Sequence, residues 1–252
     1  MYKLIMNENA KIYRQRSSII MMISLVALVV IVSLIIRFNM GIPDKSSVWE
    51  QVQSLLWISF FIKVFTIVIA GSIVANEYAW GTIKLLLIRP ISRSRVLLAK
   101  YAAALLFGLL LMAILFITAL VCNTALYGLD RVLMGGAASI TITLKVYLLK
   151  YAEIFVYGTL AFMLSVLARS STFATGFTLV TMFLGPLITL YITDHPLARY
   201  VLFMNTDLTI YAFNSSAHAG GLSLPFSLMV LAVYCLIFNT AAWLAFNKQE
   251  IS

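Results

Sequence analysis

Two ionisable residues, Lys63 and Glu153, lie inside long apolar stretches of the chain. Such a group inside a membrane costs free energy unless it is paired or hydrated. Because both stretches are expected to cross the membrane in the same direction, the two side chains should lie at similar depth and form an intramembrane charge pair. The alternative is that Lys63 extends to the interface while Glu153 is protonated or hydrated. A single pair favours a role in helix packing, since a proton relay needs titratable groups at successive depths.

Sequence patterns for catalysis are absent from the chain. No glycine is followed by lysine, so the phosphate-binding loop of an ATPase cannot form. The His-Glu-x-x-His and Cys-x-x-Cys spacings of zinc sites and the Gly-x-Ser-x-Gly pattern of serine hydrolases do not occur either. We therefore expect no catalytic, cofactor-binding or metal-binding residues on this chain and no enzymatic activity of its own.

The segment 76–95 is the most structured of the predicted loops. Thr82 is a good N-cap residue, and Pro90 disfavours helical geometry at Arg89, so the sequence predicts a short helix over 83–88. The apolar side chains of this helix are Leu85, Leu86 and Ile88, and the nearby basic ones are Lys84, Arg89 and Arg93. An apolar helix outside the membrane needs a partner to cover it, and the alternative is an amphipathic loop that rests on lipid.

Six apolar stretches position these residues, and each is long enough to cross a membrane. About 20 helical residues span the ~30 Å hydrocarbon core. The stretches lie near 18–36, 55–75, 96–122, 146–168, 172–192 and 225–246. They are continuously apolar, whereas barrel strands alternate between apolar and polar residues. We therefore predict an all-α polytopic membrane protein, with residues 1–252 forming a single transmembrane domain.

Composition and charge agree with this class and predict the orientation. The chain has 62% hydrophobic and 11% charged residues, a balance typical of membrane proteins. Its net charge of +9 does not indicate nucleic-acid binding, because the basic residues are not clustered on a soluble face. Most of the basic residues flank the first span, lie in 76–95, or lie in later loops expected on the same side of the membrane as these two segments. The positive-inside rule then predicts cytoplasmic N- and C-termini in a multi-pass protein of the bacterial cytoplasmic membrane.

Three further segments carry weaker signals. Residues 1–17 mix apolar and basic side chains, which suits either a helix in the membrane interface or a basic flank that orients the first span. Residues 193–224 are apolar enough to form short outer-face or re-entrant helices. Small residues four apart, Gly71 with Ala75 and Ala104 with Gly108, permit close contact between helices.

The residues from 77 to 100 follow a pattern that resembles the membrane permease subunits of type-2 ABC (ATP-binding cassette) transporters. The matching residues are Glu77, Gly81, Thr82, Leu86, Leu87, Pro90, Ser92, Arg93 and Lys100. Asn7, Glu8, Lys11 and the pair Arg14 and Arg16 are similar to the basic leader of that family. With six predicted spans, the resemblance covers nearly the whole chain.

This resemblance implies a function and partners. It implies the permease subunit of an ATP-driven exporter, in which two six-span permeases, identical or related, form a pathway within membrane lipid. Two copies of a separate ATPase, which would hold ATP and Mg, would bind a short cytoplasmic coupling helix between spans two and three. The residues assigned to coupling are Glu77, Gly81, Thr82, Lys84, Leu85, Leu86, Ile88, Arg89, Pro90 and Arg93. Small members of the family often move antimicrobial peptides, drugs or other amphiphiles, so a hydrophobic or amphiphilic substrate is expected.

Two other classes of function stay open from the sequence. An ion-coupled secondary transporter or channel should have several acidic residues within its spans or helices broken by glycine and proline, and Glu153 alone is a weak indication of that class. A noncatalytic membrane sensor or assembly factor is the other. A Walker-motif ATPase encoded beside this gene would favour the exporter.

Overall fold

The computed structural model describes residues 1–39, 47–81, 92–134, 136–193, 195–213 and 222–248, and within these ranges every regular element is a helix. Six helices are long and apolar enough to cross a membrane: Arg16–Phe38, Val48–Ala79, Arg93–Tyr127, Ala138–Ala168, Ser171–Ile192 and Leu224–Lys248. Each contains one of the predicted stretches. The all-α, six-span fold expected from the sequence is therefore confirmed.

The observed helices extend beyond the predicted spans. The second span is built from α3 (Val48–Ser54), the 3-10 helix η1 (Leu55–Ile58), α4 (Ser59–Ser72) and α5 (Ala75–Ala79). The third, α7 (Arg93–Tyr127), has 35 residues, and the fourth, α9 (Gly136–Ala168), has 33. At about 1.5 Å per residue, both are longer than a ~30 Å hydrocarbon core. Apolar composition therefore predicted only part of the length of each of these two helices.

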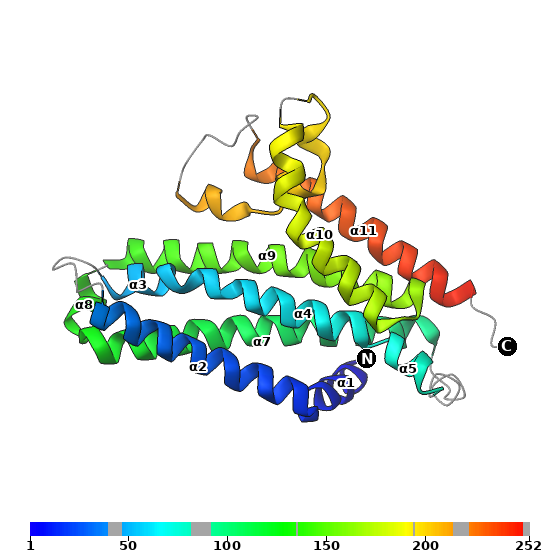
Figure 1. Ribbon diagram of the computed structural model, residues 1–252, viewed down its shortest axis with the longest axis horizontal. Helices are drawn as coiled ribbons and strands as arrows, with labels where there is room; N and C mark the ends of the chain where they lie inside the picture. Colours follow the sequence, from blue (N-terminus) through cyan, green and yellow to red (C-terminus); the bar gives the residue numbers. More distant parts are fainter. Residues whose placement is uncertain (40–46, 82–91, 135, 194, 214–221, 249–252) are drawn as a thin grey trace.

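The four helices α2 (Arg16–Asn39), α4, α7 and α9 run side by side, and α10 (Ser171–Ile192) and α11 (Leu224–Lys248) lie across them (Figure 1). Helix α9 contacts α4, α7, α10 and α11. The spans that contain α4 and α9 are the most buried of the six. Any polar residue on the facing sides of these two helices is therefore placed in the interior.

Two glycines allow close packing between spans, as their small size predicted. A Cβ atom added at Gly71 in α4 would lie 2.6 Å from Thr175 Cγ2 in α10. A Cβ atom at Gly108 in α7 would lie 2.8 Å from Thr66 Oγ1 in α4. Real Cβ atoms do not approach other atoms this closely, so these helix pairs can meet only where the side chain is absent.

Helix α1 and the last described residues of α11 lie on the side of the bundle where α5 lies (Figure 1). Helix α1 (Tyr2–Arg14) ends before Gln15, whose extended backbone turns the chain into α2, and α1 packs against α7. Figure 1 shows α1, α5 and the end of α11 toward one end of the molecule, and the short helix α8 (Asp130–Met134) at the other. This arrangement agrees with an even number of spans.

Between α10 and α11, the segment expected to form short helices contains three 3-10 helices. They are η2 (Ala198–Tyr200), η3 (Leu202–Asn205) and η4 (Leu208–Phe213). The buried Asn205 side-chain amide donates to the carbonyl oxygens of Arg199, at 2.9 Å, and Val201, at 3.0 Å. Helix η3 contacts α10 and α11, while η4 contacts α9 and α11. This segment therefore covers one side of the spanning helices.

Candidate functional site

Lys63 and Glu153 meet in the interior, where the sequence predicted a charge pair. Lys63 lies on the buried face of α4, which it shares with Ile62 and Thr66. Its ammonium group donates to the Oε1 atom of Glu153 on α9. Lys63 is 9% exposed and Glu153 is 7% exposed. The contact between α4 and α9 thus brings together two residues 90 positions apart in the chain.

A second lysine completes this mid-span cluster, defined here as Lys63, Lys150 and Glu153. Lys150 Nζ lies 2.6 Å from Glu153 Oε2, one helical turn away on α9. The Lys63 ammonium also lies 5.2 Å from the centre of the Tyr157 ring, a cation–π contact. The sequence reasoning missed Lys150, although its spacing of three residues from Glu153 on a helix was a usable signal.

A cavity of about 380 Å³ opens beside the mid-span cluster. Lys63, Glu153 and Tyr157 form one wall of this cavity. The rest of its lining comes from α10 and from the segment after it, through Met182, Pro186, Thr189, Leu190, Thr193, Phe203, Met204, Thr206 and Asp207. The cavity therefore has a charged wall on α4 and α9 and a largely apolar wall on α10.

A different cluster of charges joins α1, α5 and α7, and we call its residues Glu8, Lys11, Glu77 and Lys100 the end cluster. Lys100 Nζ on α7 donates to Glu8 Oε2 on α1 at 2.8 Å and to Glu77 Oε1 on α5 at 2.5 Å. Lys11 donates to the other Glu8 oxygen, Oε1, at 2.6 Å. Lys100 is only 2% exposed. One buried ammonium group thus links three separate elements.

Opposing effects act on the Glu8 carboxyl in this cluster. Burial alone would raise the pKa of Glu8, but the nearby ammonium groups of Lys100 and Lys11 outweigh burial and hold the pKa below its ordinary value. Glu8 is therefore ionised at neutral pH. The adjoining cavity is small, about 90 Å³.

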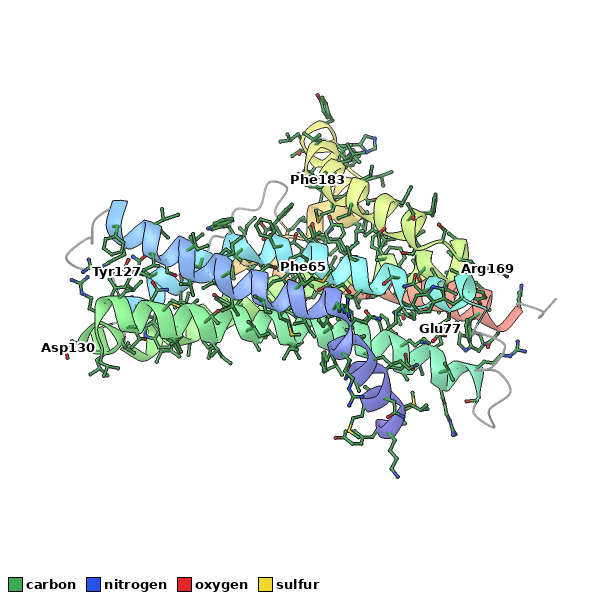
Figure 2. All side chains as sticks on the ribbon, turned by 60° about the horizontal axis from the view of Figure 1, so that its bottom comes forward. Phe65, Glu77, Tyr127, Asp130, Arg169 and Phe183 are labelled. Carbon is green, nitrogen blue, oxygen red and sulfur yellow. The ribbon has the colours of Figure 1, made fainter. Side chains whose placement is uncertain are left out.

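Helix α5 has a second attachment at the same end of the molecule. The Arg169 guanidinium carbon, in the link between α9 and α10, lies 5.2 Å from the centre of the Tyr78 ring. Figure 2 shows Glu77 and Arg169 at one end of the bundle, with Tyr127 and Asp130 at the other. Helix α5 is thus tied to α7 through Glu77 and to the link between α9 and α10 through Tyr78.

Three of the ten residues assigned to ATPase coupling belong to the described ranges. Glu77 joins the end cluster, and Arg93 is the first residue of α7. Gly81 has a φ of +68°, which favours glycine, and its N–H donates to the Tyr78 carbonyl at 3.1 Å. The other seven, Thr82, Lys84, Leu85, Leu86, Ile88, Arg89 and Pro90, lie outside the described residues. The short helix over 83–88 stays a prediction.

Among the side chains that the structure describes, no group of three or more His, Cys, Asp or Glu residues is placed to hold a metal ion. The two cysteines, Cys122 and Cys235, are both free.

Comparison with known proteins shows the family. Residues 18–252 match the family model described as "Protein of unknown function (DUF2705)". The chain is 37% identical over 237 residues to the "Uncharacterized protein YhcI" of Bacillus subtilis (strain 168), an alignment covering 86% of this chain and 74% of YhcI. It is 27% identical over 198 residues to the "Uncharacterized membrane protein YdbK" of the same strain, covering 77% of this chain and 79% of YdbK. With six long apolar helices, the chain is a multi-pass membrane protein that belongs to the DUF2705 family.

Proposed function

We propose that this chain is the permease subunit of an ATP-driven exporter that moves a hydrophobic or amphiphilic substrate out of the cell. ATP and Mg would bind a separate ATPase, present in two copies, and a second permease subunit, identical or related, would complete the pathway. The resemblance of 77–100 to type-2 ABC permeases motivates the assignment. The observation that carries it is the way the end cluster anchors the start of that segment.

The ion pairs of the end cluster hold the residues that precede 82–91, the segment on which the ATPase would exert force. Glu77 bonds to Lys100 of α7, and Lys100 bonds in turn to Glu8 of α1. The chain therefore enters 82–91 from an α5 that is held by two other elements, and it leaves that segment directly into α7, a 35-residue helix. An ATPase that displaced the segment would pull on α1, α5 and α7 together. Such a connection would transmit motion into the spans.

The proposal is tested at the predicted contact with the ATPase. Leu86→Asp places a charge in the predicted apolar contact, so association with the partner ATPase should fall at least tenfold. Pro90→Ala removes the constraint that ends the predicted helix and should lower turnover more than association. Co-purification and substrate-stimulated ATP hydrolysis measure the two effects.

A matched control separates coupling from general damage. Leu133 on α8 is 80% exposed at the other end of the molecule, so Leu133→Asp makes the same chemical change far from the predicted contact. It should leave association and turnover unchanged. If Leu86→Asp expresses normally and also leaves both unchanged, the ATPase contact lies elsewhere and the coupling assignment fails.

The mid-span cluster favours a second candidate function, an ion-coupled secondary transporter. The structure brings Lys150 to Glu153 and places Asp207 on the same cavity, so this region holds more titratable groups than Lys63 and Glu153 alone. Reconstitution of the chain into vesicles without an ATPase separates the two functions. Substrate movement driven by a proton or sodium gradient, with no requirement for ATP, would favour the secondary transporter.

A further inference from the structure

We propose that the cavity beside Lys63 and Glu153 binds the head of a zwitterionic amphiphile, a molecule with a primary ammonium and an acidic group next to an apolar chain. The idea that this ligand is the transported substrate rests on the proposed function. The idea that the cavity binds such a ligand does not depend on the proposed function.

The cavity is larger than the packing of α4 against α9 requires. A buried ion pair that only joined α4 to α9 would need no open space beside it. Instead, the wall formed by Lys63, Glu153 and Tyr157 faces a volume of about 380 Å³. Since one water occupies about 30 Å³ of liquid, this volume is enough for many waters or for a polar head group.

The charges around the cavity determine which head group fits. Among the described lining residues, Lys63 is basic and Glu153 and Asp207 are acidic, and Lys150 Nζ lies 2.6 Å from Glu153 Oε2. These four described side chains have two formal positive and two formal negative charges, so together they are neutral. A ligand with a net charge would leave one charge unbalanced in a membrane interior, which is costly. A zwitterion can place its ammonium toward the carboxylates and its acidic group toward Lys63.

The opposite wall accounts for the apolar chain of the ligand. Met182, Pro186 and Leu190 of α10 line the cavity. Leu190 is also 75% exposed, so the rim of the cavity reaches the surface of the molecule. The same surface of α10 carries Phe183 and Leu187, both exposed, and lipid would cover it. A ligand whose head lies at the charged wall can therefore extend its chain across α10 toward the bilayer.

The binding test uses the purified full chain in detergent, without an ATPase, and native mass spectrometry to obtain apparent affinities. The probes are dihexanoyl-phosphatidylethanolamine, a zwitterionic lipid, and Nα-dodecanoyl-lysine, an amphiphile with the ammonium and carboxylate of a peptide. Dihexanoyl-phosphatidylglycerol has the same chains as the first probe but no ammonium. At least one zwitterion should bind ten times or more tightly than phosphatidylglycerol, and the tighter of the two identifies a lipid or a peptide-like ligand.

Variants locate the binding to this cavity. Thr189→Phe fills the space, and Asp207→Asn removes a carboxylate charge from an exposed position while keeping an Oδ1 acceptor for the backbone N–H and hydroxyl of Thr209. Each should weaken binding of the zwitterion about tenfold, the effect of losing one charge-assisted hydrogen bond in the second case. Ile188→Phe, one residue away on α10 but outside the cavity lining, adds the same ring and should leave binding unchanged.

Three results would overturn the proposal: no binding of either zwitterion, equal binding of phosphatidylglycerol, or zwitterion binding that Asp207→Asn and Thr189→Phe leave intact. The outcome is separate from that for the proposed function. If the chain binds a zwitterion but associates with no ATPase, the binding site stands and the exporter assignment fails. If the chain forms an active complex with an ATPase but binds no zwitterion, the exporter assignment stands and the binding site fails.

Discussion

The two ionic clusters of this protein have mirror-image charge arrangements in different surroundings. In the end cluster one ammonium, that of Lys100, lies between the carboxylates of Glu8 and Glu77. In the mid-span cluster one carboxylate, that of Glu153, lies between the ammonium groups of Lys63 and Lys150. The end cluster borders a cavity of about 90 Å³ and the mid-span cluster one of about 380 Å³. Similar ion pairing can thus hold helices together where little space remains, as in the end cluster, and line a cavity where more space is open, as in the mid-span cluster.

The clusters also differ in how many elements depend on each ion. Lys100 joins α1, α5 and α7 through side chains from three places in the sequence. Glu153 joins only α4 and α9, because Lys150 lies on the same helix. Removing Lys100 therefore breaks the links to both carboxylates and leaves Glu8 with the largely exposed Lys11, while removing Lys63 leaves Glu153 with the more buried Lys150. We expect the end cluster to contribute more to stability.

The largest expected effect tests the end cluster directly. Lys100→Met should lower the free energy of unfolding by about 3–5 kcal/mol, the usual result of removing one partner from a buried ionic contact. Denaturation of the purified chain in mixed micelles measures this change. Lys11→Met is the matched control, because the Lys11 side chain is 58% exposed and an exposed pair contributes about 1 kcal/mol or less. Equal losses of stability in the two variants would show that Lys100 does not hold α1, α5 and α7 together.

An intermediate effect is expected in the mid-span cluster. Lys63→Met should cost less than Lys100→Met, because Glu153 keeps its contact with Lys150. A double-mutant cycle with Lys63→Met and Glu153→Gln should give a coupling free energy of about 0.5–3 kcal/mol. The same denaturation experiment measures it. Single effects that simply add would mean that Lys63 and Glu153 do not stabilise the bundle as a pair.

The smallest expected effect is a loss of stability at acid pH that comes from Glu8 in the end cluster. The folded-state pKa of Glu8 lies below its ordinary value of 4.5, so ionisation of Glu8 stabilises the fold fully above about pH 4.5 and this contribution is lost as the pH falls through the folded-state pKa. Below about pH 4.5 the stability of the unmodified chain should therefore fall more steeply with decreasing pH than that of Glu8→Gln. Parallel curves for the two proteins would contradict the assignment.

Much of the fold could be predicted because it depends on local composition. Each spanning helix contains its predicted apolar stretch, since about 20 apolar residues in a row favour a helix across the bilayer wherever they occur. Lys63 and Glu153 could be singled out for the same reason, because a charge inside such a stretch needs a partner. Both ends of α7 and the start of α9 could not be located, since beyond the apolar stretches these helices are stabilised by contacts with neighbouring helices.

The tertiary structure alone decided how the clusters are built and which of them is open. Glu8 and Lys100 are 92 positions apart, and only the packing of α1 on α7 makes them neighbours. Similarly, the cavity beside Glu153 exists because α10 and the segment with Thr206 and Asp207 lie against α4 and α9. Sequence thus determined which residues must leave water and which charges need partners, because transfer free energy is a property of each side chain. Where those partners lie, and how much space remains around them, depends on helix packing.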